Sequence, residues 1–208
     1  MKILPSEIKK LLEQTLPGEI SHLKMLPANR QLNAGSDDIP GMKHSSVLLL
    51  LSEIDDELTV LLIKRPSSMK YHAGQIAFPG GKMEENESAV ETALRETWEE
   101  TGISPENIEI LGGLSDLYVQ VSKFMIHPVV GWTPDFDRIV INRHEVEKVL
   151  LFPIKLLTDN IEETEIQTVT GLLKVPCVKF DGEIIWGATS MILTEFVDSL
   201  RGYRVIQQ

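Results

Sequence analysis

The sequence predicts a mixed α/β or α+β domain built from layers of helices and strands, and three observations support this fold class. Strand candidates outnumber helix candidates along the chain. The helices are interspersed among the strands, which is typical of a mixed layered architecture. The length of 208 residues, with 42% hydrophobic and 25% charged residues, suits a globular chain with one domain, with or without extensions.

The first element is a short amphipathic helix over residues 6–15, with Ser6 as its N-terminal cap. One face of this helix is formed by Ile8, Leu11, Leu12 and Thr15. Residues 26–43 are rich in Pro, Gly, Asn and Asp, which is typical of a loop or linker. We therefore expect residues 1–40 to form an N-terminal helix and linker extension, and residues 41–208 to form the main domain.

Strand candidates follow the linker. Residues 46–52 and 58–64 are apolar and compatible with β-structure, and the segment 53–57 between them predicts a hairpin. Residues 75–78 are a short strand candidate. The remaining strand candidates are residues 108–114, 124–132, 146–152, 168–175 and 183–186. A final helix is expected over residues 188–200.

The clearest helix lies between these strands, over residues 88–102. Ser88 and Glu91 have the spacing of a capping box, and Gly102 is well placed just past the end. The recurrence of apolar positions at helical spacing predicts a buried stripe formed by Val90, Ala93, Leu94 and Thr97.

Three carboxylates crowd one side of the end of this helix. Glu96, Glu99 and Glu100 fall within an arc of roughly 100°. Like charges at these spacings repel by roughly 0.2–0.5 kcal/mol per pair, and the end of a helix disfavours anions by roughly 0.3–1 kcal/mol each. A bound cation would reverse both effects, and oxygen ligands suit Mg²⁺ or Mn²⁺. The structural alternative is a solvated acidic face in which Arg95 pairs with Glu99.

The segment before the helix favours the metal interpretation. Gly80 and Gly81 are expected to lie in a loop, where the lack of a side chain lets the backbone approach a ligand closely. Glu87 adds another carboxylate between these glycines and the helix. From Gly81, five residues lead to Glu87, and seven more lead to the run Arg95-Glu96-Thr97-Trp98-Glu99-Glu100-Thr101-Gly102-Ile103.

This spacing resembles the Nudix box, GX5EX7REUXEEXGU, in which U is a bulky aliphatic residue. Every charged and glycine position of the box matches, and Thr97 stands where the family prefers Ile, Leu or Val. The likeness extends to the coenzyme A pyrophosphatase branch, whose pattern LLTXXSXXXRXXXGXXXFPGG is similar to residues 61–81. Leu61, Leu62, Gly74 and the run from Phe78 through Gly81 match, whereas Ile63, Pro66 and Lys70 differ.

The resemblance implies a Nudix-type α/β/α sandwich with a mixed sheet over residues 41–208, and hydrolysis of a nucleoside diphosphate linked to another moiety. It implies that Mg²⁺ or Mn²⁺ is bound by Glu96, Glu99, Glu100 and the backbone near Gly81. Arg95 would orient a glutamate, and Glu87 would support the loop. The general base is left open between a box glutamate, Glu145 and Glu147, with His144 as a weaker alternative.

For coenzyme A, the expected products are 3′,5′-ADP and 4′-phosphopantetheine. Lys64, Arg65 and Lys70 form the one notable basic cluster of the sequence, which either meets substrate phosphates or is solvated loop charge. Together with this cluster, the expected substrate-binding residues are Gly74, Phe78 and Gly80. The alternatives are hydrolysis of another nucleoside diphosphate derivative, such as ADP-ribose, NADH or a dinucleoside polyphosphate, and a non-catalytic binding module that retains the fold.

Charge and composition limit the expected partners. The chain has 20 basic and 31 acidic residues, a net charge of −11, which disfavours nucleic-acid and anionic membrane partners. Apolar runs such as residues 47–51 are too short to span a bilayer, and the lone Cys177 has no disulfide partner within the chain. We expect a cytoplasmic enzyme with a small nucleotide substrate of the coenzyme A type, no nucleic-acid or membrane partner, and a homodimer left open.

Overall fold

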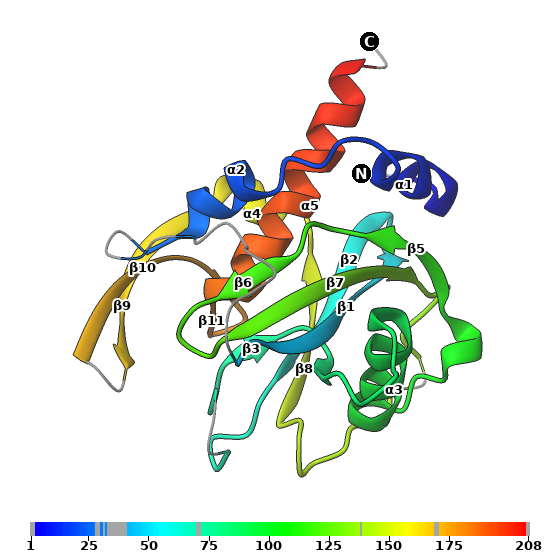
Figure 1. Cartoon of the computed structure of the whole chain (residues 1–208). Coiled ribbons are helices and arrows are strands. Elements are labelled where there is room, and N and C mark those ends of the chain that lie inside the picture. Colours follow the sequence, from blue (N-terminus) through cyan, green and yellow to red (C-terminus); the bar gives the residue numbers. More distant parts are fainter. Residues whose placement is uncertain are drawn as a thin grey trace.

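The computed structural model describes residues 3–27, 30, 32, 41–69, 72–137, 139–168 and 171–206. Most of the expected 26–43 linker, and Lys70, lie outside these ranges. The fold is an α/β/α sandwich with a mixed β-sheet between helices, in agreement with the fold class that the sequence predicts (Figure 1). Within the same ranges, no helix combines the length and apolar character needed to cross a membrane.

The sheet is built around the hairpin that the sequence predicts. β1 (Lys43–Ile54) and β2 (Glu57–Lys64) pair antiparallel, and Asp55 and Asp56 form their turn with φ angles of 50° and 60°. Two successive positive φ angles are typical of a type I′ turn, whose twist matches that of the flanking strands. On its other side β1 runs parallel to β7 (Phe124–Trp132), so the sheet is mixed.

Shorter strands complete this sheet around the hairpin. The main strand order is β3-β2-β1-β7-β5, where β3 is Ile76–Ala77 and β5 is Glu109–Gly113. Three more strands pair with members of this order: β4 (Gly80–Lys82) with β1, β6 (Leu117–Val119) with β7, and β8 (Lys148–Pro153) with β2.

Alternate side chains of β1 contact the two helical layers, because successive residues of a strand point to opposite faces. Leu48 and Leu50 belong to the core that contains Ala93 of α3 (Ala89–Thr101). Leu49 and Leu51 belong to the core shared with α1 (Pro5–Leu12) and α5 (Gly187–Ile206). Figure 1 shows α1 and α5 above the sheet and α3 below it. Site residues on α3 therefore lie on one defined face of the sheet.

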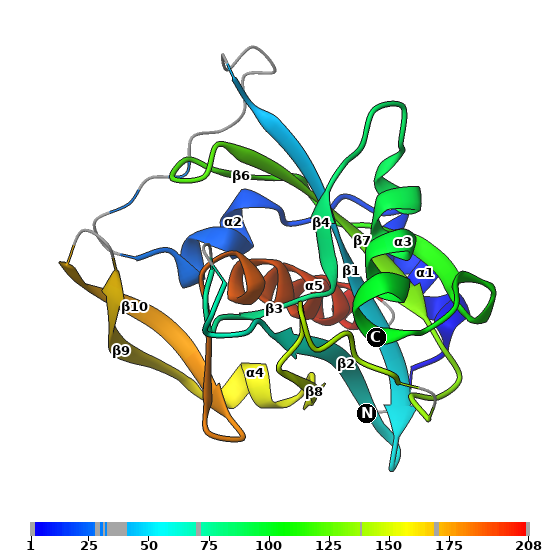
Figure 2. The ribbon, with the colours of Figure 1, turned by 90° about the horizontal axis from the view of Figure 1, so that it is seen from below.

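A second, antiparallel sheet has the order β11-β10-β9, with β9 at Ile161–Thr168, β10 at Gly171–Phe180 and β11 at Glu183–Trp186. The β9–β10 hairpin extends away from the main sheet in both views (Figure 1 and Figure 2). The predicted strand 168–175 is wrong at its start, because Thr168 ends β9 and pairs with Gly171. β9 was not predicted because its sequence, IEETEIQT, is rich in charged residues.

The N-terminal segment also differs in detail from the prediction. α1 begins at Pro5, so Ser6 lies inside the helix, and the N-terminal cap is the backbone of Leu4, whose N–H donates to Glu7 Oε2 at 2.8 Å. Two short helices, α2 (Glu19–His22) and α4 (Leu156–Asp159), were not predicted. Helices this short carry almost no periodic signal in a sequence.

The N-terminal segment is attached to α5 by a buried polar pair. His22 Nε2 lies 2.9 Å from Glu195 Oε2, and the other carboxylate oxygen of Glu195 accepts the N–H of Ser115 at 3.1 Å. Glu195 is 0% exposed, so both of its oxygens depend on these partners. Ile8 and Met25 of the same segment lie in the core shared with α5. The division of the chain into an extension over residues 1–40 and a main domain over residues 41–208 stays a prediction.

Candidate active site

Helix α3 begins and ends as the sequence predicts. Ser88 Oγ accepts the N–H of Glu91 at 3.2 Å, and Glu91 Oε2 accepts the N–H of Ser88 at 2.8 Å. At the other end Gly102 has a φ of 72° and donates its N–H to the carbonyl of Trp98 at 2.8 Å. These local contacts fix the helix that carries the acidic residues.

The buried face of α3 agrees with the expected stripe at Ala93 and Thr97, which are both 0% exposed, and differs at two other positions. Val90 is 37% exposed, whereas Glu100, outside the expected stripe, is 1% exposed. The Thr97 hydroxyl donates to the carbonyl of Ala93 at 2.7 Å, so this polar group needs no further partner in the core. Glu100 is buried because α3 turns its side chain toward the glycine-rich strand β4, where the Gly80 N–H donates to Glu100 Oε2 at 3.0 Å.

Two glycines of β4, which the sequence predicts to lie in a loop, are packed too closely for a side chain. A Cβ added to Gly81 would lie 2.3 Å from Cδ and Oε1 of Glu96. Gly80 has a φ of 155°, and a Cβ there would lie 2.4 Å from the carbonyl oxygen of Ser46 on β1. Neither position tolerates a side chain without displacement, because real Cβ contacts are longer than 3.0 Å. The strand therefore presents bare backbone to the carboxylates of α3.

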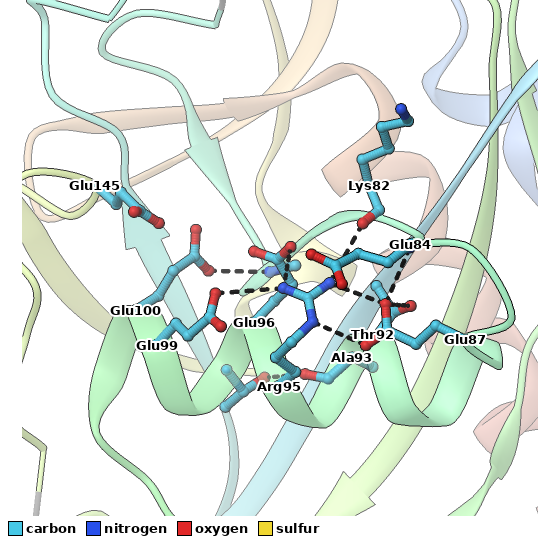
Figure 3. A network of polar contacts seen from close by, with 12 residues as sticks. Lys82, Glu84, Glu87, Thr92, Ala93, Arg95, Glu96, Glu99, Glu100 and Glu145 are labelled. Atoms are coloured by element: carbon cyan, nitrogen blue, oxygen red, sulfur yellow. Dashed lines mark hydrogen bonds and ion pairs between the residues drawn. The ribbon is translucent and has the colours of Figure 1, made fainter.

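Arg95 connects the acidic residues of the helix and of the preceding loop (Figure 3). Its Nε and Nη2 donate to the two oxygens of Glu87 at 2.8 and 3.0 Å, as in a bidentate pair. Its Nη1 donates to Glu96 Oε1 at 2.8 Å and to Glu99 Oε2 at 3.3 Å. Nη2 also donates to the carbonyl of Lys82 at 3.3 Å. The guanidinium thus fixes Glu96 and the loop with one rigid group.

Glu87 is ionised in this network. The hydrogen bonds from Arg95 hold the pKa of Glu87 at about 2, against the opposing effect of burial. The hydroxyl of Thr92 donates to Glu87 Oε2 at 2.7 Å, and the backbone N–H of Glu84 donates to the same oxygen at 3.1 Å. All these donors point at Glu87, so its carboxylate is fully engaged in supporting the loop and Arg95.

Three carboxylates from distant parts of the chain converge beside this network. One oxygen from each of Glu96, Glu100 and Glu145 lies within 4.8 Å of the others. Ligand oxygens about 2.1 Å from an octahedral Mg²⁺ lie about 3.0 Å apart when adjacent and about 4.2 Å apart when opposite. A slight contraction would therefore let all three bind one ion, and an all-oxygen donor set suits Mg²⁺ or Mn²⁺. The residues present fit a divalent cation.

The protonation of these carboxylates reflects their crowding. Burial is the largest of the effects that together raise the pKa of Glu100 to about 8; the neighbouring Glu96 and Glu145 add to the rise, and the Gly80 N–H and Arg65 oppose it. Burial also raises the pKa of Glu96, and the hydrogen bond from Arg95 opposes that rise. The Gly80 N–H donates to Glu100 Oε2 at 3.0 Å, so this carboxylate is held in position against β4. A bound cation would favour the ionised forms of Glu96 and Glu100.

Glu145 reaches the cluster through a loop that caps α3. The backbone N–H of Asn142 donates to the carbonyl of Glu100 at 3.0 Å, and the N–H of Val140 donates to that of Thr101 at 2.8 Å. The carbonyl of Asn142 accepts the N–H of Glu145 at 3.0 Å, and its side-chain Nδ2 lies 3.4 Å from Glu145 Oε1. The sequence predicts Glu145 only as a general base. It does not predict Asn142 as a site residue, because Asn142 positions Glu145 through backbone hydrogen bonds to Glu100 and Glu145.

Other predicted site residues lie outside the three-carboxylate group. Glu99 is 45% exposed and contacts Arg95. Glu147 Oε1 lies 3.2 Å from Lys64 Nζ, which also donates to Glu183 at 3.0 Å. Lys64 therefore already has two carboxylate partners.

The remaining residues expected to bind substrate have different environments. Arg65 Nη1 lies 3.6 Å from Glu100 Oε1, so this residue does border the cluster. Gly74 has a φ of 68° and donates its N–H to the carbonyl of Arg65 at 3.1 Å. Phe78 is 3% exposed and packs in the core shared with α5. Lys70 lies outside the described residues.

Comparison with known proteins identifies the class of this molecule. The NUDIX domain family model matches residues 42–170, and the chain therefore belongs to the Nudix family of hydrolases. It is 35% identical to "Nudix hydrolase 3" of Caenorhabditis elegans over 72% of this chain, a match that spans 63% of that relative, less than two thirds of its length. It is also 35% identical to "Uncharacterized Nudix hydrolase NudL" of Pectobacterium atrosepticum, over 65% of this chain and 71% of that one.

Solved structures agree with the fold. The Nudix hydrolase RenU of M. smegmatis superposes with a TM-score of 0.54 at 14% identity, over 88% of this chain and 95% of its own. The MutT protein of Methanosarcina mazei Go1 gives a TM-score of 0.52 at 20% identity, over 80% of this chain and 98% of its own. With the matches to Nudix hydrolases above, the chain is a member of the Nudix family that has the family's fold.

Proposed function

We propose that this chain hydrolyses the diphosphate of coenzyme A or its thioesters, giving 3′,5′-ADP and 4′-phosphopantetheine or its acyl derivative. The observation that carries this proposal is the segment 61–81, which is similar to the coenzyme A pyrophosphatase pattern and ends in β4. Both ends of this segment contact one carboxylate, because Arg65 and Gly80 lie beside Glu100. A substrate recognised by this segment would have its diphosphate next to the acidic cluster.

We propose that Mg²⁺ or Mn²⁺ is bound by Glu96, Glu99 and Glu100 with the backbone near Gly81, and that Glu145 is a further ligand or the general base. A bound ion supplies charge neutralisation for the diphosphate and lowers the pKa of an attacking water. Arg95 acts as a positioning residue, because it donates to Glu96 at 2.8 Å while Glu87 holds its other edge.

Between the two distal candidates for the base, the contacts favour Glu145. Its carboxylate is close to Glu96 and Glu100, whereas that of Glu147 pairs with Lys64 at 3.2 Å. A base that must accept a proton from water at the cluster has to be within hydrogen-bond reach of that water. On the substrate side we propose Arg65 and Lys70 for phosphate contacts, with Lys64, Gly74, Phe78 and Gly80 shaping the segment that carries them.

The decisive experiment is incubation of the full chain with coenzyme A, acetyl-coenzyme A, ADP-ribose, NADH and diadenosine polyphosphates, with Mg²⁺ or Mn²⁺ and products identified by mass. We expect 3′,5′-ADP from the coenzyme A compounds at the highest kcat/KM. Preferential cleavage of ADP-ribose, NADH or a dinucleoside polyphosphate would replace this proposal with the alternative substrate class.

A non-catalytic binding module is the second alternative, and a pair of variants tests it. Glu100→Gln should lower kcat at least about 100-fold, equivalent to about 2.7 kcal/mol of transition-state stabilisation. Glu106→Gln, which changes an exposed glutamate outside the cluster, should retain full turnover. Absence of turnover on every substrate by the unmodified chain would favour the binding module. A cytoplasmic location and a homodimer stay predictions, the latter checked by light scattering.

A further inference from the structure

Two histidines outside the acidic cluster face each other across the neighbouring strands β1 and β7. His44 on β1 and His127 on β7 have their nitrogens Nδ1 and Nε2, respectively, 2.9 Å apart. On the edge of the His127 ring that faces away from His44, His127 Nδ1 lies 2.8 Å from Asp116 Oδ1. The three side chains form a line that runs Asp116–His127–His44, and the Nudix chemistry described above uses none of them.

The ring geometry shows how the two nitrogens are aimed. The ring planes differ by 6° and the centroids are 5.2 Å apart. That separation is close to the sum of the 2.9 Å contact and the two ring radii, so both nitrogens lie between the centroids. The rings are therefore edge to edge, and their nitrogen lone-pair directions converge on the space between His44 and His127.

The carboxylate determines which nitrogen of His127 is free to bind. A carboxylate oxygen accepts hydrogen bonds, so the tautomer in which His127 donates its Nδ1–H to Asp116 leaves the lone pair of Nε2 facing His44. A carboxylate behind a histidine is the usual outer-shell arrangement of metal-binding imidazoles, where it fixes the tautomer and raises the basicity of the ligand. Without an ion, His44 donates its Nδ1 proton to His127.

We propose that His44 and His127 form a two-imidazole binding site for a divalent cation of the Zn²⁺, Ni²⁺ or Cu²⁺ type, with Asp116 in its outer shell. Two nitrogens at about 2.0–2.1 Å from a tetrahedral Zn²⁺ lie about 3.3 Å apart. Because the two nitrogens face each other along one line, the rings would have to separate by about 0.4 Å from the present 2.9 Å contact and also tilt, so that both lone pairs point at an ion beside that line. His44 is exposed, so its proton can move to Nε2 and water can complete the coordination.

This site differs in chemistry from the acidic cluster and does not depend on the proposed substrate. Imidazole nitrogens suit Zn²⁺, Ni²⁺ and Cu²⁺, whereas carboxylates suit Mg²⁺ and Mn²⁺. A bound ion would join β1, β7 and the segment of Asp116. The carbonyl of His44 also accepts the N–H of Met83 at 3.0 Å, so the site adjoins the loop that leads to Glu87 and α3.

The test is calorimetric titration of the metal-free full chain with Zn²⁺ in excess Mg²⁺, which occupies the carboxylates. We expect one Zn²⁺ per chain, with affinity at least about tenfold weaker in His44→Gln and His127→Ala, and about 10–100-fold weaker in Asp116→Asn. His144→Ala removes an exposed histidine outside the pair and should leave the affinity unchanged.

Two further measurements separate metal binding from folding. In EDTA, the circular dichroism spectra of all four variants should match that of the unmodified chain, and added Zn²⁺ should raise Tm only where the pair is intact. Electron paramagnetic resonance of bound Cu²⁺ should show two nitrogen ligands in the unmodified chain and one in His44→Gln. Zn²⁺ affinity that is absent in the unmodified chain, or equal in His127→Ala, would show that the pair is only a hydrogen-bonded contact.

Discussion

Replacement of Gly81 by alanine should disable the acidic cluster without unfolding the chain. The new Cβ would lie 2.3 Å from Cδ and Oε1 of Glu96 and 2.6 Å from its Oε2, whereas ordinary contact begins at 3.4 Å. The carboxylate must therefore move by about 1.1 Å, the difference between 3.4 and 2.3 Å. It cannot simply rotate into solvent, because Glu96 is 15% exposed and Arg95 holds Oε1 at 2.8 Å.

A displacement of about 1 Å in a positioned catalytic group lowers the rate by roughly 100-fold, or about 2.7 kcal/mol. We expect this loss in kcat at saturating Mn²⁺, together with weaker Mn²⁺ binding measured by electron paramagnetic resonance of the free ion. The far-ultraviolet circular dichroism of Gly81→Ala should stay unchanged, because the substitution removes no core side chain.

Gly202 offers a matched control for this substitution. It lies in α5, and a Cβ there would meet no atom within 4 Å. Gly202→Ala should retain full activity and Mn²⁺ binding, and should stabilise the helix by up to about 1 kcal/mol. If Gly81→Ala has the kcat and the Mn²⁺ affinity of the unmodified chain, the tight contact between β4 and Glu96 does not position a catalytic group, and the reasoning is refuted.

Three further predictions concern the same cluster. The folded state binds the proton of Glu100 more tightly than the unfolded state does, so the free energy of unfolding in EDTA should fall by about 3–5 kcal/mol as pH rises from 4.5 to about 8. Glu100→Gln should abolish most of that fall in urea titrations, and an unchanged slope would contradict the assigned burial effect. Glu145→Gln should lower kcat at least about tenfold and change its pH profile, whereas Glu147→Gln should do neither; the reverse order would move the base to Glu147. Asn142→Ser keeps a side-chain acceptor but loses the Nδ2 donor, so it should lower kcat several-fold at constant KM, and an equal loss in Tm would indicate a purely structural role.

Local sequence rules predict the elements whose signals are local. The β1–β2 hairpin and the two ends of α3 agree with the prediction, because the turn and the caps are encoded within the elements themselves. Local rules do not predict β4, because two of its three residues are glycines, which have low strand propensity. Gly80–Lys82 is a strand because β1 supplies its hydrogen-bond partners.

The site residues show the same difference between local and non-local signals. The carboxylates of α3 follow from helical geometry, and the structure brings Glu96 and Glu100 together at β4. The arrival of Glu145 depends on a loop whose backbone donates to the last carbonyls of α3, which no local pattern encodes. Lys64 shows another non-local effect, since this basic residue near the phosphate pattern pairs with Glu147 and Glu183, and its role toward substrate stays a prediction.

The buried pair between His22 and Glu195 imposes an order on biosynthesis. Its members are 173 residues apart, so the ribosome makes His22 early and its partner among the last residues of the domain. Until α5 emerges, the core that Ile8 and Met25 share with it is incomplete, and part of their apolar surface stays open to other nascent chains. Such non-local contacts also slow folding in a refolding experiment. The chain should therefore complete this core only after α5 has left the ribosome.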